Sequence, residues 1–367
     1  MQTFKLNNAR LICVWVSLII FATSVLVIQI NVFGFKGLGR SMSLDVYTQL
    51  EPFEGGTNQL EDFLFIDIDE ASLTNLGQWP WPRVVLAKAL KKILDANPVV
   101  VGVDILLAEP DRFNPKALAD LAQDEENIVE HYFVNGDQVL SEIIIGHPVV
   151  LATAFNKDNK NEVKNKSKVL IKHKARFDIP TIPGIIFPIN QLKGAGGFGF
   201  VNVDLDNADN TVRYLPLLAS LNGNFFPSFV LELVRIFEED KMLNLESSGK
   251  AFPLNVIATG FSRIPVTKEG NFILHNGFSK RFSTLSISKI LDGSLDEHTL
   301  AGMISNKIII VGSSASGLND LHASNIEKAV PGPLIQLSAT HQILSERYLK
   351  FSIETDLATI ALLFFAL

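Results

Sequence analysis

An uncharged, apolar run of 25 residues near the N-terminus constrains the fold of this chain more than any other feature. It extends from Leu11 to Phe35, between Arg10 and Lys36, and about 20 apolar residues suffice to cross a bilayer as a helix. A cleaved signal peptide has a shorter apolar centre followed by small residues, and no such cleavage site follows this run. The run therefore predicts an uncleaved transmembrane helix at residues 11–35.

The last residues of the sequence, 357–367, are also wholly apolar. Because so short a run cannot cross a bilayer, we interpret residues 355–367 as the start of a second transmembrane helix that is cut short. A short buried helix is the alternative. Lysine and arginine residues on the two sides of the first run balance each other, so the positive-inside rule does not orient the chain.

The sequence between these runs must be stabilised by its own core. The only cysteine, Cys13, lies in the first apolar run, so residues 36–354 form no disulfide, and their length allows a sizeable core. The net charge of −7 disfavours a nucleic-acid-binding surface. The lysine-rich stretch at 156–176 also contains Asn and Ser, which indicates a solvated loop.

Short β-branched segments alternate with helical patterns between the two runs, and the order strand, helix, strand forms a parallel βαβ unit. Buried strands are predicted at residues 63–69, 99–107, 147–155 and 307–315. Helices are predicted at residues 81–97, 228–240 and 334–349. Residues 197–227 indicate antiparallel hairpins, with turns at 207–210 and at Asn222-Gly223. The predicted fold is α/β: a largely parallel sheet with flanking helices and added hairpins, in one domain.

Acidic residues follow the first two predicted strands, at the edge where open α/β sheets bind ligands. They are Asp67, Asp69, Glu70, Asp104, Glu109 and Asp111. Converging carboxylates repel one another unless positive charge neutralises them. Arg83, Arg112 and Arg213 could supply that charge in a salt-bridge network. A Mg²⁺ or Ca²⁺ ion held by Asp67, Asp69 and Asp104 is the alternative, and both interpretations stay open.

Two tryptophans, each next to proline, stand between the first strand and the following helix, in the sequence Trp79-Pro80-Trp81-Pro82-Arg83. Pro80 favours an extended conformation at Trp79, and Pro82 suits the first turn of a helix. The stretch therefore predicts a rigid corner. Its two indoles could form a cage for an amine or a ring-shaped ligand, or they could bury against the sheet.

No catalytic centre is evident in the sequence. The glycine-bounded stretch 312–317 follows a predicted strand but lacks the Lys-Ser/Thr ending of a phosphate-binding loop. Residues 204–215 lack the glycine and glutamate of a calcium loop. Histidines are scattered without metal-binding spacing. Asp320 and His322 are further candidates for ligand binding or signalling, although a histidine in such a context is more often a structural hydrogen-bonding residue.

Four blocks, at residues 65–83, 99–112, 197–218 and 307–332, taken together resemble the CHASE domain of the second type, an extracytoplasmic sensory module of cyclases and histidine kinases. The resemblance covers most of residues 40–350. It implies a sensor that follows an N-terminal anchor and precedes further membrane helices and a cytoplasmic output domain. Outputs in the family include class III adenylate or guanylate cyclases, histidine kinases, diguanylate cyclases and serine/threonine kinases.

The resemblance also implies a location. Residues 1–10 would be cytoplasmic, the anchor would lie in the inner membrane, and residues 36–354 would form a periplasmic or extracellular sensor that works as a homodimer. One departure from the family pattern is Leu337-Ser338, where a His-Ala step is expected. Two alternatives stay open: an anchored enzyme binding a nucleotide at 312–317, and a module that only binds another protein.

Overall fold

The computed structural model describes most of the chain between residues 60 and 349. The described residues are 15, 41, 42, 44–48, 60–122, 133–156, 170–173, 177–205, 209–248, 254–275, 282–318, 321–324 and 327–349. Residues 54–349 form one compact unit, and residues 1–53 with 350–367 form another. Apart from Trp15, both predicted membrane spans lie outside the described residues. Within the described part, no helix combines the length and apolar character that a membrane crossing requires.

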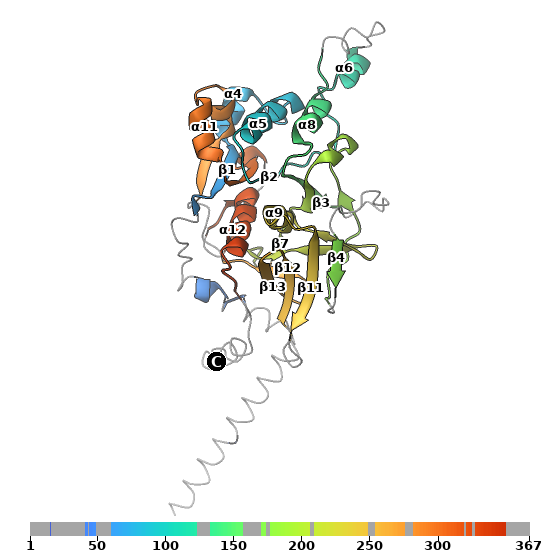
Figure 1. Cartoon of the computed structure of the whole chain (residues 1–367), viewed down its shortest axis with the longest axis vertical. Helices are drawn as coiled ribbons and strands as arrows, with labels where there is room; N and C mark the ends of the chain where they lie inside the picture. The colour runs from blue at the N-terminus through green and yellow to red at the C-terminus, as the bar shows by residue number, and fades with distance from the viewer. Residues whose placement is uncertain are drawn as a thin grey trace, which may run out of the picture. The chain divides into compact units, whose positions relative to one another are not determined.

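A parallel sheet lies at the centre of the larger unit (Figure 1). In spatial order its strands are β15 (Ser283–Ser286), β1 (Phe63–Ile68), β16 (Ile308–Ser313), β2 (Val100–Val103), β3 (Val149–Phe155) and β6 (Gly197–Phe200). The short β5 (Ile185–Ile186) pairs antiparallel with β3. Every residue of β1 and β2 is buried, as in a sheet covered on both faces. The four predicted strands and the parallel α/β architecture are thus confirmed.

Helices pack on both faces of this sheet. One face carries α5 (Arg83–Asp95), α8 (Gly136–Ile144), α10 (Ile287–Leu291) and α11 (Glu297–Ile304), which share a core with Leu64 and Ile66 of β1. The other face contacts α9 (Phe229–Phe237) and α12 (Gly332–Leu344). Successive strand residues point to opposite faces, so Phe63, next to Leu64, reaches His341 of α12. Two further helices are α4 (Glu70–Leu76) and α6 (Pro115–Ala122).

Smaller sheets complete the unit. One contains β13 (Ser262–Val266), β12 (Leu254–Thr259), β11 (Met242–Ser248) and β4 (Leu170–His173), and another contains β14 (Asn271–Ile273), β8 (Val212–Pro216) and β7 (Asp204–Leu205). Strands β9 (Leu218–Leu221) and β10 (Asn224–Pro227) form a hairpin. The pair β17 (Leu321–His322) and β18 (Val330–Pro331) is the shortest. In Figure 1, the sheet with β11–β13 and β4 lies at the end opposite α4, α5 and α11.

The hairpin prediction for residues 197–227 is right in part. The turn at Asn222-Gly223 has positive φ angles of 52° and 77°, as such a hairpin requires. Strand β6, however, belongs to the parallel sheet beside β3. A Cβ at Gly199 would collide with the backbone of Phe229, so glycine here permits α9 to lie close against the sheet. The Gly-Phe alternation reflects this approach and not an antiparallel ribbon.

The prediction of a solvated loop at 156–176 is also wrong in part. Residues Leu170–His173 form β4, which pairs in parallel with β11 at the edge of its sheet. Residues 157–169 lie outside the described part of the chain. Alternating lysines hid the strand because an edge strand tolerates lysine readily.

Helix α12 is buried on every side. All residues from Gly332 to Ile343 are buried, which is the pattern of a core helix and not of an amphipathic surface helix. Several of its polar side chains hydrogen-bond to backbone groups. The Gln342 side chain accepts from the His275 N–H at 3.0 Å and donates to the His275 carbonyl at 3.1 Å. Gln336 donates to the Val201 carbonyl at 2.9 Å.

His341 on α12 lies in an apolar environment. Its ring meets Phe63 and Phe282 edge-on, with ring centroids 5.0 and 5.9 Å away. Burial, together with the nearby positive charge of Arg347, lowers the pKa of His341 to about 4. The imidazole is therefore neutral in the folded protein at neutral pH.

Candidate functional site

A pocket of about 620 Å³ opens at the carboxyl edge of the parallel sheet. Ile68, Ser313 and Asp104, at the ends of β1, β16 and β2, contribute to its wall, together with Val201 after β6. Open α/β sheets bind ligands at this edge. Among the residues singled out from the sequence, those that line the pocket are Trp79, Trp81, Arg83, Asp104, Glu109, Asp111 and Arg112. We call this cavity the tryptophan pocket.

The two indoles of the pocket have different environments. Trp81 is 4% exposed and its Nε1 donates to the Gly77 carbonyl at 2.7 Å. Trp79 is half-buried and meets Trp81 edge-to-face, with ring centroids 5.2 Å apart. The Trp79–Pro80 peptide bond is cis. Because the rings are nearly perpendicular, they do not form a cage with two parallel faces. Trp81 is fixed in the core, and Trp79 is the more accessible ring.

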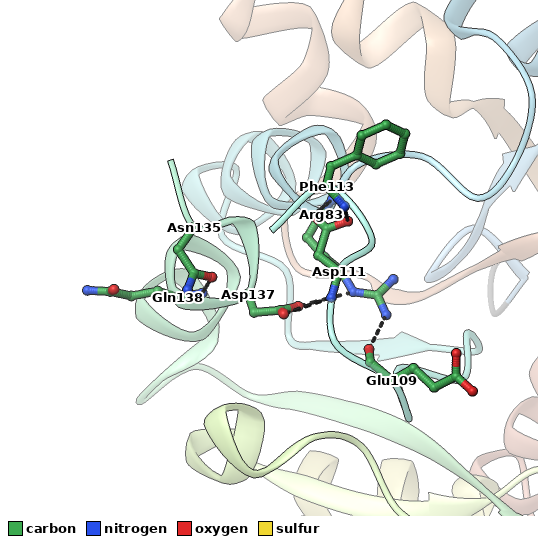
Figure 2. A network of polar contacts seen from close by, with 7 residues as sticks. All are labelled: Arg83, Glu109, Asp111, Phe113, Asn135, Asp137 and Gln138. Carbon is green, nitrogen blue, oxygen red and sulfur yellow. Dashed lines mark hydrogen bonds and ion pairs between the residues drawn. The ribbon is translucent and has the colours of Figure 1, made fainter. Parts of the chain in front are cut away.

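Arg83, the first residue of α5, is held by three contacts (Figure 2). Its backbone N–H donates to Oδ2 of Asp111 at 2.7 Å. Its Nη2 donates to the carbonyl of Glu109 at 3.2 Å, and its Nε lies 3.5 Å from Oδ1 of Asp137. Arg83 is 9% exposed and Asp137 is completely buried. The pair is therefore a buried ion pair that joins the start of α5 to the start of α8.

Asp111 and Asp137 continue this network in the loop after β2. The Asp111 N–H donates to Oδ2 of Asp137 at 2.8 Å, and Oδ1 of Asp111 accepts from the N–H of Phe113 at 3.0 Å. A Cβ at Gly136 would lie 2.7 Å from Oδ2 of Asp111 and 2.9 Å from Cβ of Arg83. Only glycine fits between α8 and this loop.

Sequence reasoning missed Asp137. The available signal was Asn135-Gly136-Asp137, because Asn135 caps α8 by accepting from the Gln138 N–H at 3.2 Å and acids favour the first turn of a helix. That signal locates a helix start. It does not reveal that the acid faces Arg83, which is distant in sequence.

The acids that end β1 lie in a different environment, where serines bind them. Asp67 accepts from the N–H and the hydroxyl of Ser314, at 2.9 and 2.6 Å. Asp69 caps α4 by accepting from the N–H and the hydroxyl of Ser72, at 2.8 and 2.5 Å, and it also accepts from the hydroxyl of Ser286 at 2.9 Å. We call Asp67, Asp69 and Glu70, with Ser72, Ser286, Ser314 and Ser316, the serine-bound edge.

Asp67 and Asp69 differ in their acidity. Burial raises the pKa of Asp67 and outweighs the hydrogen bonds from Ser314. For Asp69 burial acts in the same direction, but the hydrogen bonds from Ser72 and Ser286 outweigh it and hold its pKa below the ordinary value. Neighbouring acids on one strand end therefore have opposite shifts.

At the serine-bound edge, N–H groups that a bound nucleotide would need are already engaged by carboxylates of the chain. A phosphate site after β16 would need the free N–H groups of residues 314–317. The Ser314 N–H donates to Asp67, and the Ser316 N–H donates to Glu70 at 3.0 Å. The stretch Ser316–Leu318 is a single 3₁₀ turn, not the start of an α-helix. Carboxylates of the chain itself occupy the positions that a phosphate would take.

The six acids do not converge on a single cluster, which corrects the expectation from the sequence. Serine hydroxyls and backbone N–H groups bind Asp67 and Asp69, whereas Asp104 lines the tryptophan pocket. Within the described residues, no three His, Cys, Asp or Glu side chains are arranged to hold a metal ion. The serines and backbone N–H groups thus supply hydrogen bonds to Asp67 and Asp69, and a Mg²⁺ or Ca²⁺ site at Asp67, Asp69 and Asp104 stays a prediction.

Three remaining candidates lie away from the pocket lining or outside the described residues. Arg213, in β8, binds Asp209 through bonds of 2.6 and 2.8 Å and lowers the pKa of that carboxyl group strongly. His322 lies in β17, and Asp320 is outside the described residues. Neither Arg213 nor His322 is among the described residues that line the tryptophan pocket.

A comparison with protein-family models matches residues 18–367 to the CHASE2 domain. The chain belongs to the CHASE2 family. No curated protein and no solved structure matches the chain. The resemblance found in the four sequence blocks is thus confirmed. CHASE2 domains are extracytoplasmic sensory domains of signalling proteins and are not catalytic, so this CHASE2 chain is a sensor region.

Proposed function

We propose that this CHASE2 chain is the ligand-binding part of a membrane receptor, and that the tryptophan pocket is where it binds its signal. The pocket lies at the edge where parallel sheets take ligands. It combines an accessible indole with charged groups and apolar residues, as small-molecule sites do. The expected nucleotide and metal sites lack this combination.

The contact between the pocket wall and α12 is the observation that carries the proposal. Gly312 and Ser313 end β16, and a Cβ at Gly312 would collide with the ring of Pro333 in the first turn of α12. One turn further, Gln336 donates to the carbonyl of Val201, which lines the pocket. A ligand that moves this wall must therefore move α12 or break its contacts.

Helix α12 is suited to pass such a movement toward the membrane. It is buried on every side, so it moves as a packed unit. It ends at Leu344, and the predicted second span begins at residue 355. We propose that occupancy of the pocket shifts α12 and, through the segment after it, the transmembrane helices. A ligand achieves this only by binding the two states with different affinities.

The rest of the receptor follows from the family. We propose a homodimer in the inner membrane, with residues 1–10 in the cytoplasm and spans at 11–35 and from 355 onward. The sensor would be periplasmic or extracellular and would bind no nucleic acid. The output best supported by the resemblance is a class III adenylate or guanylate cyclase; a histidine kinase, diguanylate cyclase or serine/threonine kinase is the alternative.

A fusion of residues 1–367 to the membrane helices and catalytic domain of a class III cyclase tests this function. Cyclic nucleotide production should respond to the extracytoplasmic solution. Trp79→Leu should weaken the response by weakening binding. Gln336→Leu should keep binding but weaken the response, because it loses the bond to Val201. Activity that is indifferent to every condition, or a response unchanged by Trp79→Leu, would contradict the proposal. A co-purifying protein partner, with no small-molecule response, would favour the protein-binding alternative.

The membrane arrangement has its own test. Phe261 is 84% exposed in the turn between β12 and β13, and Cys13 is the only natural cysteine. In Cys13→Ser, Phe261→Cys, a maleimide that does not cross membranes should label intact cells from outside. Labelling that needs cell lysis would place this domain in the cytoplasm and overturn the proposed topology.

A further inference from the structure

The charges around the tryptophan pocket favour a cation. Arg83 is paired with the buried carboxylate of Asp137, so it adds hydrogen-bond donors but little net charge. Of the other charged side chains that line the pocket, Asp104, Glu109 and Asp111 are acidic, and Arg112 alone is basic. The lining therefore keeps an excess of negative charge, and a low-dielectric cleft concentrates the field of such charges.

Glu109 is the acid best placed to meet a ligand. Its backbone carbonyl accepts from Arg83, which fixes the loop. Its side chain is exposed, and Figure 2 shows its carboxylate turned away from Arg83. Asp111, in contrast, is buried and already accepts from the N–H groups of Arg83 and Phe113. The loop thus holds Asp111 as part of the scaffold and leaves the side chain of Glu109, a pocket-lining residue, exposed.

Trp79 and the apolar residues of the pocket complete the arrangement. The half-buried indole of Trp79 lies in the same lining as Ile68, Ile105, Leu106 and Leu318. An ammonium group is attracted both to carboxylates and to the face of an indole, and its apolar body would cover the aliphatic lining. Carboxylates alone would suit a metal ion, but the indole and the aliphatic residues do not.

Arg83 adds a requirement for a hydrogen-bond acceptor. The residue is nine-tenths buried and lines the pocket. Its Nη2 donates to the Glu109 carbonyl and its Nε lies 3.5 Å from Oδ1 of Asp137 without forming a hydrogen bond, whereas Nη1 has no acceptor within the described part of the chain. A carbonyl or hydroxyl oxygen on the ligand would supply that partner, and such a neutral acceptor leaves the net positive charge of the ligand unchanged.

We infer that the tryptophan pocket binds a small organic cation, a primary amine on an apolar body with a hydrogen-bond acceptor beside the ammonium group. Trp79 and Glu109 would bind the ammonium group and Arg83 the acceptor. This inference rests on the proposed function, because it names the ligand class of the same pocket. The pocket volume of about 620 Å³ is in the range of small-molecule sites.

Four compounds that share one apolar body test the charge requirement. Leucinamide carries a single positive charge, leucine is a zwitterion, N-acetyl-leucinamide is neutral and N-acetyl-leucine is an anion. Calorimetric titration of the full chain in detergent micelles should give the tightest binding for leucinamide, weaker binding for leucine, and none for the two acetylated compounds. Equal binding of the neutral compound, preference for the anion, or no binding of any compound overturns the inference.

Variants then locate the binding. Trp79→Leu should weaken leucinamide binding roughly threefold to thirtyfold, and Glu109→Gln roughly twofold to fivefold. Glu269→Gln removes the same charge from an exposed turn far along the chain and should leave binding unchanged. If Trp79→Leu binds leucinamide like the parent, the pocket is not the site and the inference is wrong.

The same compounds separate this inference from the proposed function. In the cyclase fusion, leucinamide binding without any change in activity would retain the ligand class and contradict the receptor function of the pocket. A fusion that responds to its surroundings through Trp79, but prefers neutral or anionic compounds, would retain the function and overturn the ligand class.

Discussion

The serine-bound edge and the tryptophan pocket lie at the carboxyl ends of adjacent parallel strands, and both are rich in acids. At the serine-bound edge, the loop after β16 folds back over the end of β1, and its hydroxyl and N–H groups bind Asp67 and Glu70. At the tryptophan pocket, the loop after β2 turns away toward α5 and α8 and leaves a cavity. Acids at the serine-bound edge therefore have structural roles, whereas at the tryptophan pocket Asp111 is structural and the side chain of Glu109 is exposed.

This difference shows that the hydrogen-bond partners of an acid, and not its position after a strand, determine whether it supports the fold or can bind a ligand. A carboxylate that accepts from several donors of the chain has little capacity left for a ligand. Asp69 accepts three such hydrogen bonds. Glu109 uses its backbone for the fold and leaves its side chain exposed. Stability should thus depend on the serine-bound edge and the Arg83 network, whereas binding should depend on Trp79 and Glu109.

The largest expected effect comes from the buried ion pair that supports the pocket. Asp137→Ala leaves the Arg83 guanidinium buried without its counter-charge, and it removes an acceptor from the Asp111 N–H. We expect the free energy of unfolding to fall by about 3–5 kcal/mol, measured by urea denaturation. The exposed Lys91–Asp95 pair provides the control, because Asp95→Ala should cost less than about 1 kcal/mol. Similar losses in the two variants would show that the Arg83 network does not hold the pocket.

The second largest effect is a pH dependence of stability, which we expect from His341 in α12. The pKa of His341 is about 4 in the folded protein, against an ordinary value of 6.5. The unfolded chain therefore binds more protons between these values. The contribution of a neutral His341 is complete above pH 6.5 and is lost as pH falls toward 4, by about 3 kcal/mol. The melting temperature of the parent should fall over this range.

His341→Leu should flatten this pH dependence and so separate acid effects in the core from those at the two edges. His298→Leu, at an exposed position on α11, should keep the dependence of the parent. A His341→Leu profile that matches the parent would mean that other groups cause the acid sensitivity.

The third effect distinguishes two acids within the serine-bound edge. Asp69→Ala removes the cap of α4 and should lower the free energy of unfolding by about 1–2 kcal/mol at pH 7. Because the folded pKa of Asp69 lies below 3.8, its contribution is present above that value and is lost as pH falls. The loss in free energy of unfolding caused by Asp69→Ala should therefore be smaller at acidic pH.

Asp67 should show the opposite sign. Its folded pKa lies above 3.8, so its favourable contribution is present below that value and is lost as pH rises. The melting temperature of Asp67→Asn, relative to that of the parent, should therefore be higher at pH 7 than at pH 3. Thermal denaturation at the two pH values measures both variants, and parallel behaviour of Asp67→Asn and Asp69→Ala would contradict the pKa assignments.

The smallest expected effect on stability belongs to Glu109. Its exposed side chain can change to that of glutamine at a cost within about 0.5 kcal/mol, while leucinamide binding weakens. This outcome would sharpen the contrast with Asp69→Ala, which should reduce stability and leave binding unchanged. A large loss of stability in Glu109→Gln would show that Glu109 supports the fold and does not serve ligand binding alone.

Much of the fold could be predicted from the sequence, because buried parallel strands such as Phe63–Ile68 and Val100–Val103 are continuous apolar runs. The position of the pocket followed from the same pattern, since ligands bind where such strands end. A helix was predicted at residues 334–349, and α12 spans Gly332–Leu344. Its burial on every side could not be predicted, because its glutamines look like solvated residues until His275 and Val201 become their neighbours.

The division of the acids could not be predicted, because it depends on contacts between distant segments. Ser314 and Ser286 reach Asp67 and Asp69 only because β16 and β15 flank β1, and no local pattern gives that strand order. Serine carries no charge, so it was absent from a search for neutralising partners. Strands β6 and β4 were misassigned for similar reasons: neighbours in space, α9 and β11, decide their environment.

The most direct test of the central claim is ¹⁹F NMR of the full chain labelled with 5-fluorotryptophan. The chain contains three tryptophans, Trp15, Trp79 and Trp81, and Trp→Phe variants assign their resonances. During a leucinamide titration, the account predicts a saturable shift of the Trp79 resonance and no shift for Trp15, with the same affinity in Asp69→Ala and weaker affinity in Glu109→Gln. A Trp79 resonance that stays constant, or an affinity that depends on Asp69 and not on Glu109, would contradict the account.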